Sequence, residues 1–97
     1  MKLIRFHPEA ETEMIQAALW YEKQQVDLGK RFLAAIQDCL NKIEINPLLY
    51  PAIEGESRRC LIKTFPFGVI FRIKPNLIIV EAIMHLHRDP DYWKNRQ

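Results

Sequence analysis

The fold is decided by residues 58–85, RRCLIKTFPFGVIFRIKPNLIIVEAIMH, in which three apolar runs are separated by turn residues. The runs at 58–65, 68–73 and 76–85 are rich in Ile, Val and Phe, which are common in β-strands. The KPN of residues 74–76 places a proline where a tight turn accepts one. The stretch therefore predicts three consecutive antiparallel strands.

The residues before this stretch predict one more strand and two helices. KLIRF, residues 2–6, alternates polar and apolar side chains and reads as a short strand. Apolar residues then recur at helical spacing over 9–25 and again over 28–46, as in two helices joined by a tight turn. Residues 47–57 have no period and predict a loop. The expected fold is α+β, ordered β-α-α-β-β-β, with a small antiparallel sheet and a helical hairpin on one face.

Length and composition indicate one domain. The 97 residues, with 48% apolar and 27% charged side chains, are typical of a globular domain over residues 1–97. The apolar run at 77–84 contains Glu81 and is too short to cross a bilayer. MKLIRFHPEAE lacks the features of a secretion signal, so we expect a cytoplasmic protein without membrane association. Cys39 and Cys60 are then expected to stay reduced, in or near the core.

Charge is divided unevenly along the chain. Residues 1–57 carry six Lys/Arg against nine Asp/Glu, a net −3, whereas residues 58–97 carry eight against three, a net +5. A positive half favours nucleic acid or another anionic partner. The alternative is a solvated edge strand, on which Arg58, Arg59 and Lys63 only discourage aggregation.

Alternation along the strands assigns side chains to the two faces of the sheet. We expect the polar Arg72 and Glu81 to face away from the helices. That choice places basic and apolar side chains together on this outer face: Arg59, Leu61, Lys63, Gly68, Ile70, Arg72, Ile79, Glu81, Ile83, His85 and His87. The side chains expected to face the helices are those of Cys60, Ile62, Val69, Phe71, Ile73, Ile78, Val80 and Met84.

Such an apolar patch is rarely left bare in a soluble protein. We expect the C-terminal DPDYWKNR to fold back over part of it, with Tyr92 and Trp93 as anchors, and a partner segment to cover the rest. A second aromatic pair, Trp20 and Tyr21, is expected to pack between the two helices.

The stretch HLHRDPDYW, residues 85–93, admits three interpretations: a metal or catalytic site, a basic platform for phosphates, or a lid that pins the C-terminus. His85 and His87 have a spacing that can bind zinc, but no third ligand is evident, so no metal is expected. Arg88 beside Asp89 can also be a local ion pair. The lid is the preferred interpretation, with both histidines and Arg88 at the edge of the basic face.

Several motifs in matching order resemble the RelE/ParE superfamily of bacterial toxins, and its ParE-like branch of plasmid stabilisation proteins in particular. They are FHPEAETEMIQAALWYEKQ, LGKRF, NPLLYP, RRCLIKTFPFGVIFR and HLHRDPDYWKNR. The resemblance implies the same β-α-α-β-β-β fold and a cognate antitoxin, bound in a hetero-oligomeric complex. It also suggests that the antitoxin covers the apolar outer residues: Leu61, Ile70, Ile79, Ile83 and Trp93.

Two mechanisms occur in the superfamily. RelE-like members cut mRNA on the ribosome without a metal or other cofactor, using basic side chains and a C-terminal aromatic residue. For this chain that resemblance implies Arg59, Arg88 and Tyr92 as catalytic residues. However, Leu61 and Gly68 stand where basic residues are expected, and losing such donors costs about 100- to 1000-fold in rate each.

ParE-like members bind DNA gyrase and trap it on cleaved DNA, with no chemistry of their own. WYE, FPF and the H-x-x-R-D-P-x-x-W ending resemble this branch more closely. A gyrase-directed toxin is therefore the preferred expectation, with an mRNA interferase or a relative that has lost toxicity as alternatives. The residues expected to meet the target or an anion are Arg58, Arg59, Lys63, Arg72, His85, His87 and Arg88.

Overall fold

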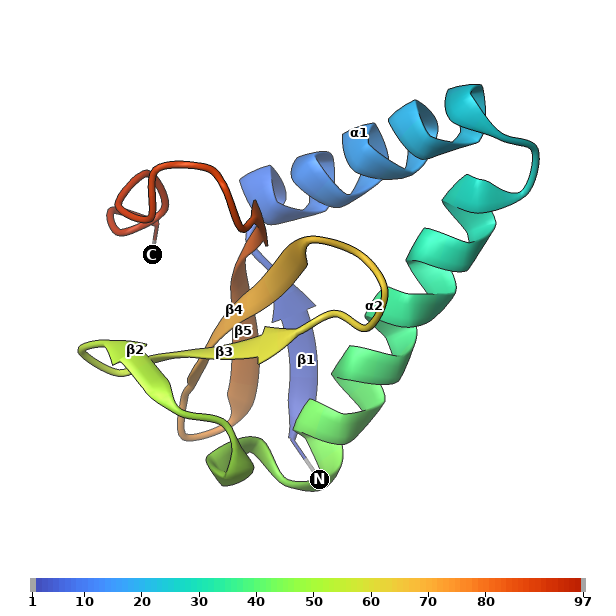
Figure 1. The fold of residues 1–97 in the computed structure, drawn as a ribbon. Coiled ribbons are helices and arrows are strands. Elements are labelled where there is room, and N and C mark those ends of the chain that lie inside the picture. The colour runs from blue at the N-terminus through green and yellow to red at the C-terminus, as the bar shows by residue number, and fades with distance from the viewer. Residues whose placement is uncertain (1, 97) are drawn as a thin grey trace.

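A computed structural model describes residues 2–96 as one sheet with a helical hairpin on one face (Figure 1). The elements in chain order are β1 (Leu3–Phe6), α1 (Pro8–Gln24), α2 (Leu28–Ile45), a single 3₁₀ turn η1 (Pro47–Leu49), β2 (Ala52–Glu54), β3 (Ser57–Leu61), β4 (Phe67–Ile73) and β5 (Leu77–His85). Within residues 2–96, neither long helix is apolar enough to span a membrane. The predicted α+β class and the order of its main elements are confirmed.

The sheet has the order β1-β5-β4-β3-β2 and is mixed, not purely antiparallel as predicted. The strand pairs β2–β3, β3–β4 and β4–β5 are antiparallel, but β1 lies parallel to β5. The strand β2 falls in the predicted loop, because three residues are too few to show alternation. Strand β3 ends at Leu61, earlier than predicted, and Thr64 takes a left-handed φ of 69° in the turn that follows.

Local sequence explains where α1 begins. Pro8 occupies its first turn, where the missing N–H costs nothing. The Nδ1 atom of His7 accepts a hydrogen bond from the backbone N–H of Glu9 at 3.1 Å and so caps the helix. Glu9 and Glu11 lie in the first turn, near the positive end of the helix dipole.

The turn between the helices depends on Glu22 and Gly29. The Glu22 carboxylate accepts hydrogen bonds from the backbone N–H groups of Asp27 at 2.8 Å and Gly29 at 3.0 Å. A Cβ atom on Gly29 would lie 2.4 Å from the Ala18 carbonyl oxygen, so the close approach of the two helices requires glycine there.

The core between helices and sheet, here called the helix-side core, is built by α2 and the sheet, with α1 contributing the buried Ala10 and Ala18 and the partly buried Met14 and Tyr21. Four apolar residues of α2 at helical spacing are buried: Phe32, Ile36, Cys39 and Ile43. They meet the inward side chains of the strands, among them the predicted Cys60, Ile62, Val69, Phe71, Ile78 and Val80. Alternation therefore assigns most of this face correctly.

A β-bulge interrupts the alternation of β5. Ile70 pairs with Ala82, but its neighbour Phe71 pairs with Val80, so Glu81 is an extra residue on β5. Every side chain beyond the bulge consequently moves to the opposite face from the one predicted.

Because of the bulge, three side chains of β5 lie on the opposite face from the one predicted. Ile83, expected on the outer face, is 2% exposed in the helix-side core. Met84, expected to face the helices, lies on the outer face, while the His85 ring contacts Phe67 on the helix side at 5.0 Å.

Candidate functional site

The outer face is covered by the C-terminal segment, residues 86–96, as the lid interpretation predicts. The Trp93 side chain is 2% exposed and packs on Ile70, Ala82 and Met84, with Ile53 at the edge of this outer cluster. The Trp93 indole nitrogen is buried without a hydrogen-bond partner among the described residues. Trp93 therefore anchors the segment through apolar contact.

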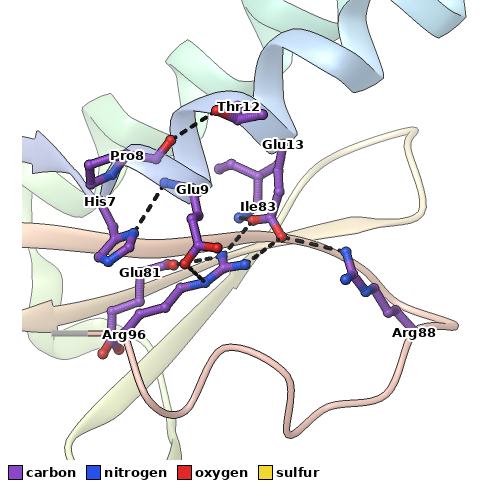
Figure 2. Close-up of polar contacts among 9 residues, drawn as sticks. All are labelled: His7, Pro8, Glu9, Thr12, Glu13, Glu81, Ile83, Arg88 and Arg96. Carbon is purple, nitrogen blue, oxygen red and sulfur yellow. Dashed lines mark hydrogen bonds and ion pairs between the residues drawn. The ribbon is translucent and has the colours of Figure 1, made fainter.

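A second anchor ties the same segment to helix α1 through Glu13 (Figure 2). The Arg96 guanidinium donates to both Glu13 carboxylate oxygens, at 2.9 and 3.1 Å, and Arg88 lies 3.6 Å from one of them. The same carboxylate accepts the backbone N–H of Ile83 at 3.0 Å. Strand β1 pairs with β5 only as far as Val80, so beyond that residue this edge of β5 has no neighbouring strand. Glu13 therefore accepts the backbone N–H of Ile83, which would otherwise lack a partner on this edge.

Arg96 is the most enclosed charged group of the segment, with a side chain 10% exposed. It also lies 3.4 Å from the Glu9 carboxylate and donates to the Glu81 carbonyl oxygen at 3.1 Å. Burial alone would lower the pKa of Arg96, but the hydrogen bonds and charge of Glu13 raise it. The site prediction contained neither Glu13 nor Arg96.

Tyr92 lies between two guanidinium groups. The Cζ atom of Arg88 is 3.8 Å from the centre of the Tyr92 ring, and that of Arg96 is 5.0 Å from it. Burial and the neighbouring Glu13 carboxylate raise the pKa of Tyr92. The phenol is protonated at neutral pH even at the ordinary tyrosine pKa of 10.0, and this shift makes its deprotonation harder, which disfavours a role as a general base.

A polar cluster of Ser57, Arg72 and Glu81 lies on the outer face beside the bulge of β5. Glu81 is 3% exposed; it accepts a hydrogen bond from the Ser57 hydroxyl at 2.6 Å and lies 3.6 Å from the Arg72 guanidinium. Arg72, predicted to bind an anion, thus has its charge balanced by a buried carboxylate.

Arg59 is the basic residue of the outer face that keeps its predicted place without a compensating charge. No carboxylate of residues 2–96 lies within 4.0 Å of its guanidinium. A Cβ atom on Gly68 would lie 3.1 Å from the Cγ and Cδ atoms of Arg59, so glycine makes room for this side chain. Arg59 and Trp93 line a hollow of about 270 Å³ at the edge of the segment.

The other predicted basic residues do not gather around Arg59. The Arg58 guanidinium donates to the Tyr50 carbonyl oxygen at 2.6 Å. Lys63 lies in the turn beyond β3, and the His87 ring lies 5.3 Å from that of His85, which the bulge turns to the helix side. In the part of the chain that the structure describes, no group of three His, Cys, Asp or Glu is arranged to hold a metal ion.

The predicted apolar contact set is mostly covered. Ile70, Ile83 and Trp93 are at most 2% exposed in the chain alone, and their contact with an antitoxin stays a prediction. Leu61 remains 57% exposed and Ile79 is half-buried.

An accessible apolar surface lies elsewhere, at the C-terminal half of α1. Trp20 was predicted to pack between the helices but is 57% exposed; only Tyr21 packs inward, against Phe32. A hollow of about 430 Å³ opens beside Trp20, lined by Ala17, Trp20, Tyr21, Pro66, Phe67 and His85. The WYE motif contained two residues of this hollow, Trp20 and Tyr21, but the helical period alone could not assign Trp20 to a face.

Comparisons with known proteins agree with this architecture. The family model described as "ParE toxin of type II toxin-antitoxin system, parDE" matches residues 4–90. A search of curated proteins finds no match. A chain from the solved structure titled "Chromosomal ParDE TA system from P. aeruginosa" is 17% identical and superposes with a TM-score of 0.65, covering 90% of this chain and 98% of that one.

Proposed function

Because this chain belongs to the ParE toxin family of type II toxin–antitoxin systems, we propose that it blocks DNA replication by binding DNA gyrase and performs no chemistry of its own. Membership of the family makes it the toxin of such a system, with a cognate antitoxin as its partner. The gyrase target, a cytoplasmic site of action and the hetero-oligomeric complex with the antitoxin are parts of the proposal.

The charge balance of the outer face carries the proposal. Cutting RNA without a metal needs cationic donors that stabilise charge on the phosphate and a group that accepts the proton of the 2′-hydroxyl. Arg88 and Arg96 instead share the Glu13 carboxylate, and Arg72 lies on Glu81. These contacts support a protein-binding toxin over an RNA-cutting one.

The aromatic candidate supports the same choice. The raised pKa of Tyr92 makes its phenol harder to deprotonate, and its ring is enclosed by Arg88 and Arg96. Tyr92 therefore serves to hold the C-terminal segment in place. Arg59 alone is not a catalytic set, but it is well placed to contact a partner protein at the edge of that segment.

Accessible apolar groups supply the remaining contact area. Leu61 beside Arg59 offers a small surface for the target. The hollow at Trp20 offers a larger surface. We assign this hollow to the antitoxin in place of the buried Ile70 and Ile83. Exposed tryptophans in hollows are frequent energetic centres of protein interfaces.

The test uses the purified chain with purified gyrase and plasmid DNA. We expect inhibition of supercoiling and accumulation of linear DNA after protein digestion. The variant Arg59→Ala should lose most of this activity with an unchanged melting temperature, because Arg59 forms no ion pair within residues 2–96. Arg31→Ala, an exposed arginine on α2, is the matched control.

A parallel reaction with ribosomes and mRNA separates the alternative. Cleavage of the mRNA with gyrase unaffected would replace the proposal by an mRNA interferase. Inactivity in both reactions, with a folded protein, would indicate a relative that has lost toxicity.

A further inference from the structure

Two thiols lie side by side between α2 and β3, in the helix-side core. The Cys39 sulfur is 3.7 Å from the Cys60 carbonyl oxygen. Both sulfurs lie against the Leu61 carbonyl oxygen, at 3.6 Å for Cys39 and 3.8 Å for Cys60. Both cysteines are buried and carry free thiols. This thiol pair joins the middle of a helix to a strand of the sheet.

Hollows on two sides give small molecules a way to the pair. One, of about 250 Å³, has both cysteines in its wall; the other, of about 340 Å³, reaches Cys60. The charged residues that line the first hollow are Arg31, Asp38, Lys42 and Lys63. Lys42 and Arg59 line the second. Cations outnumber the single carboxylate, and an electropositive surrounding favours a thiolate.

The two thiols differ in the environment that each provides for a negative charge. Hydrogen bonds from Cys39 and Tyr50, with the Lys42 charge, lower the pKa of Cys60 to about 7 against the opposing effect of burial. The hydrogen bond with Cys60 and burial raise the pKa of Cys39. At neutral pH Cys60 is therefore the nucleophile and Cys39 stays a thiol.

We propose that Cys60 and Cys39 form a peroxide-responsive pair that closes as a disulfide between β3 and α2. The Cys60 thiolate attacks one oxygen of hydrogen peroxide, the O–O bond breaks, hydroxide leaves, and Cys60 becomes a sulfenic acid. The Cys39 sulfur then loses its proton and attacks the Cys60 sulfur. The S–O bond breaks, water leaves, and the disulfide forms. Peroxide is reduced while the two thiols are oxidised.

The bond would constrain the unfolded chain, because it closes a loop between residues 21 positions apart. Such a crosslink should raise the melting temperature of this small domain by about 10 °C. It would also fix α2 beneath the strand that carries Arg59 and Leu61.

The test treats the full chain with a modest excess of hydrogen peroxide and follows intact mass, disulfide-linked peptides and melting temperature. We expect the loss of two hydrogen atoms, a Cys39–Cys60 linked peptide and the higher melting temperature, all reversed by dithiothreitol. Disulfides only between molecules, or oxidation only when urea unfolds the chain, would overturn the proposal.

Variants assign the roles within the pair. In Cys39→Ser, which keeps a hydroxyl donor, dimedone should trap Cys60 as a sulfenic acid, whereas Cys39 in Cys60→Ser should react at least tenfold more slowly. Equal labelling of the two would contradict the assignment. Tyr50→Phe leaves both cysteines in place but removes the Tyr50 hydroxyl that lowers the pKa of Cys60, so it should slow oxidation severalfold. An unchanged oxidation rate would also contradict the assignment of Cys60 as the nucleophile. If a cysteine variant fails to fold, dimedone can be added together with peroxide to the unmodified chain. It should then label Cys60 in preference to Cys39.

Discussion

The two faces of the sheet are covered in physically different ways. The helix-side core is a continuous apolar layer in which Phe32 is surrounded by the rings of Tyr21, Phe65 and Phe67. The outer face is covered by a segment without regular structure, held by one tryptophan and by the carboxylate of Glu13. The helix-side core therefore determines whether the chain folds, whereas the segment of residues 86–96, here called the outer cover, determines which groups the folded toxin presents.

The largest effect should come from the helix-side core. Phe32→Ala removes a fully buried ring and should lower the free energy of unfolding by about 4 kcal/mol, measured by urea denaturation. A loss smaller than that of Trp93→Ala would reverse the ranking of the two faces.

Removing the apolar anchor of the outer cover should have the next largest effect. Trp93→Ala should cost about 3 kcal/mol, less than the core variant because the outer cluster is small and the indole N–H finds no hydrogen-bond acceptor within residues 2–96. Hydrogen exchange should show faster exchange in residues 86–96 with the helices still protected. An unchanged melting temperature would show that the segment is not a lid.

The charged anchor comes third. Glu13→Gln keeps the size of the side chain but removes the charge that Arg96 and Arg88 share, and should cost about 2 kcal/mol. Thermal melts at increasing salt can check this against Glu11→Gln, an exposed residue of the same helix. Equal effects of the two substitutions would show that Glu13 contributes only surface charge.

Alkaline pH should weaken the outer cover. The pKa of Tyr92 is raised above its ordinary value of 10.0, so its folded form keeps the proton longer than the unfolded form does. The resulting stability is complete below about pH 10 and is lost as pH rises through the folded pKa. The pH dependence of urea denaturation should therefore be shallower above pH 10 in Tyr92→Phe than in the parent chain. Tyr50→Phe is the comparison variant, because burial also raises the pKa of Tyr50, to about 12.

The smallest effect on stability should come from Trp20→Ala, although it lies on the helix side. An exposed side chain should change the free energy of unfolding by less than about 0.5 kcal/mol. Its affinity for the antitoxin should nevertheless fall at least tenfold by calorimetry, if the hollow at Trp20 is the docking site. Leu19→Ala, equally exposed on the same helix, is the control.

The sequence determines much of this architecture locally, and the exceptions have physical causes. Helical period and strand alternation predict both helices and the three long strands, because each buries a face against the helix-side core. The bulge at Glu81 is not predictable, because Ala82, Ile83 and Met84 are all apolar and suit either face. The mixed sheet also escapes local patterns, because the pairing of β1 with β5 joins the two ends of the chain.

The candidate site was predictable in part. Trp93 as a lid anchor followed from an aromatic residue beyond an exposed apolar strand face. The Glu13–Arg96 pair lies 83 positions apart in sequence, so no spacing rule connects its members. Residue type alone assigned Arg88 to an anion site, and the resemblance to RNA-cutting toxins assigned Arg88 and Tyr92 to catalysis. Their neighbours in space give them a structural role.

The proposed action of this toxin is to stop replication by binding gyrase. It is tested most directly by inducing the chain alone in a bacterial host and following incorporation of labelled thymidine and labelled amino acids over the first minutes. If the toxin acts on gyrase, thymidine incorporation should fail first, while amino-acid incorporation continues. Collapse of amino-acid incorporation before any change in thymidine would contradict it and indicate a toxin that cuts mRNA.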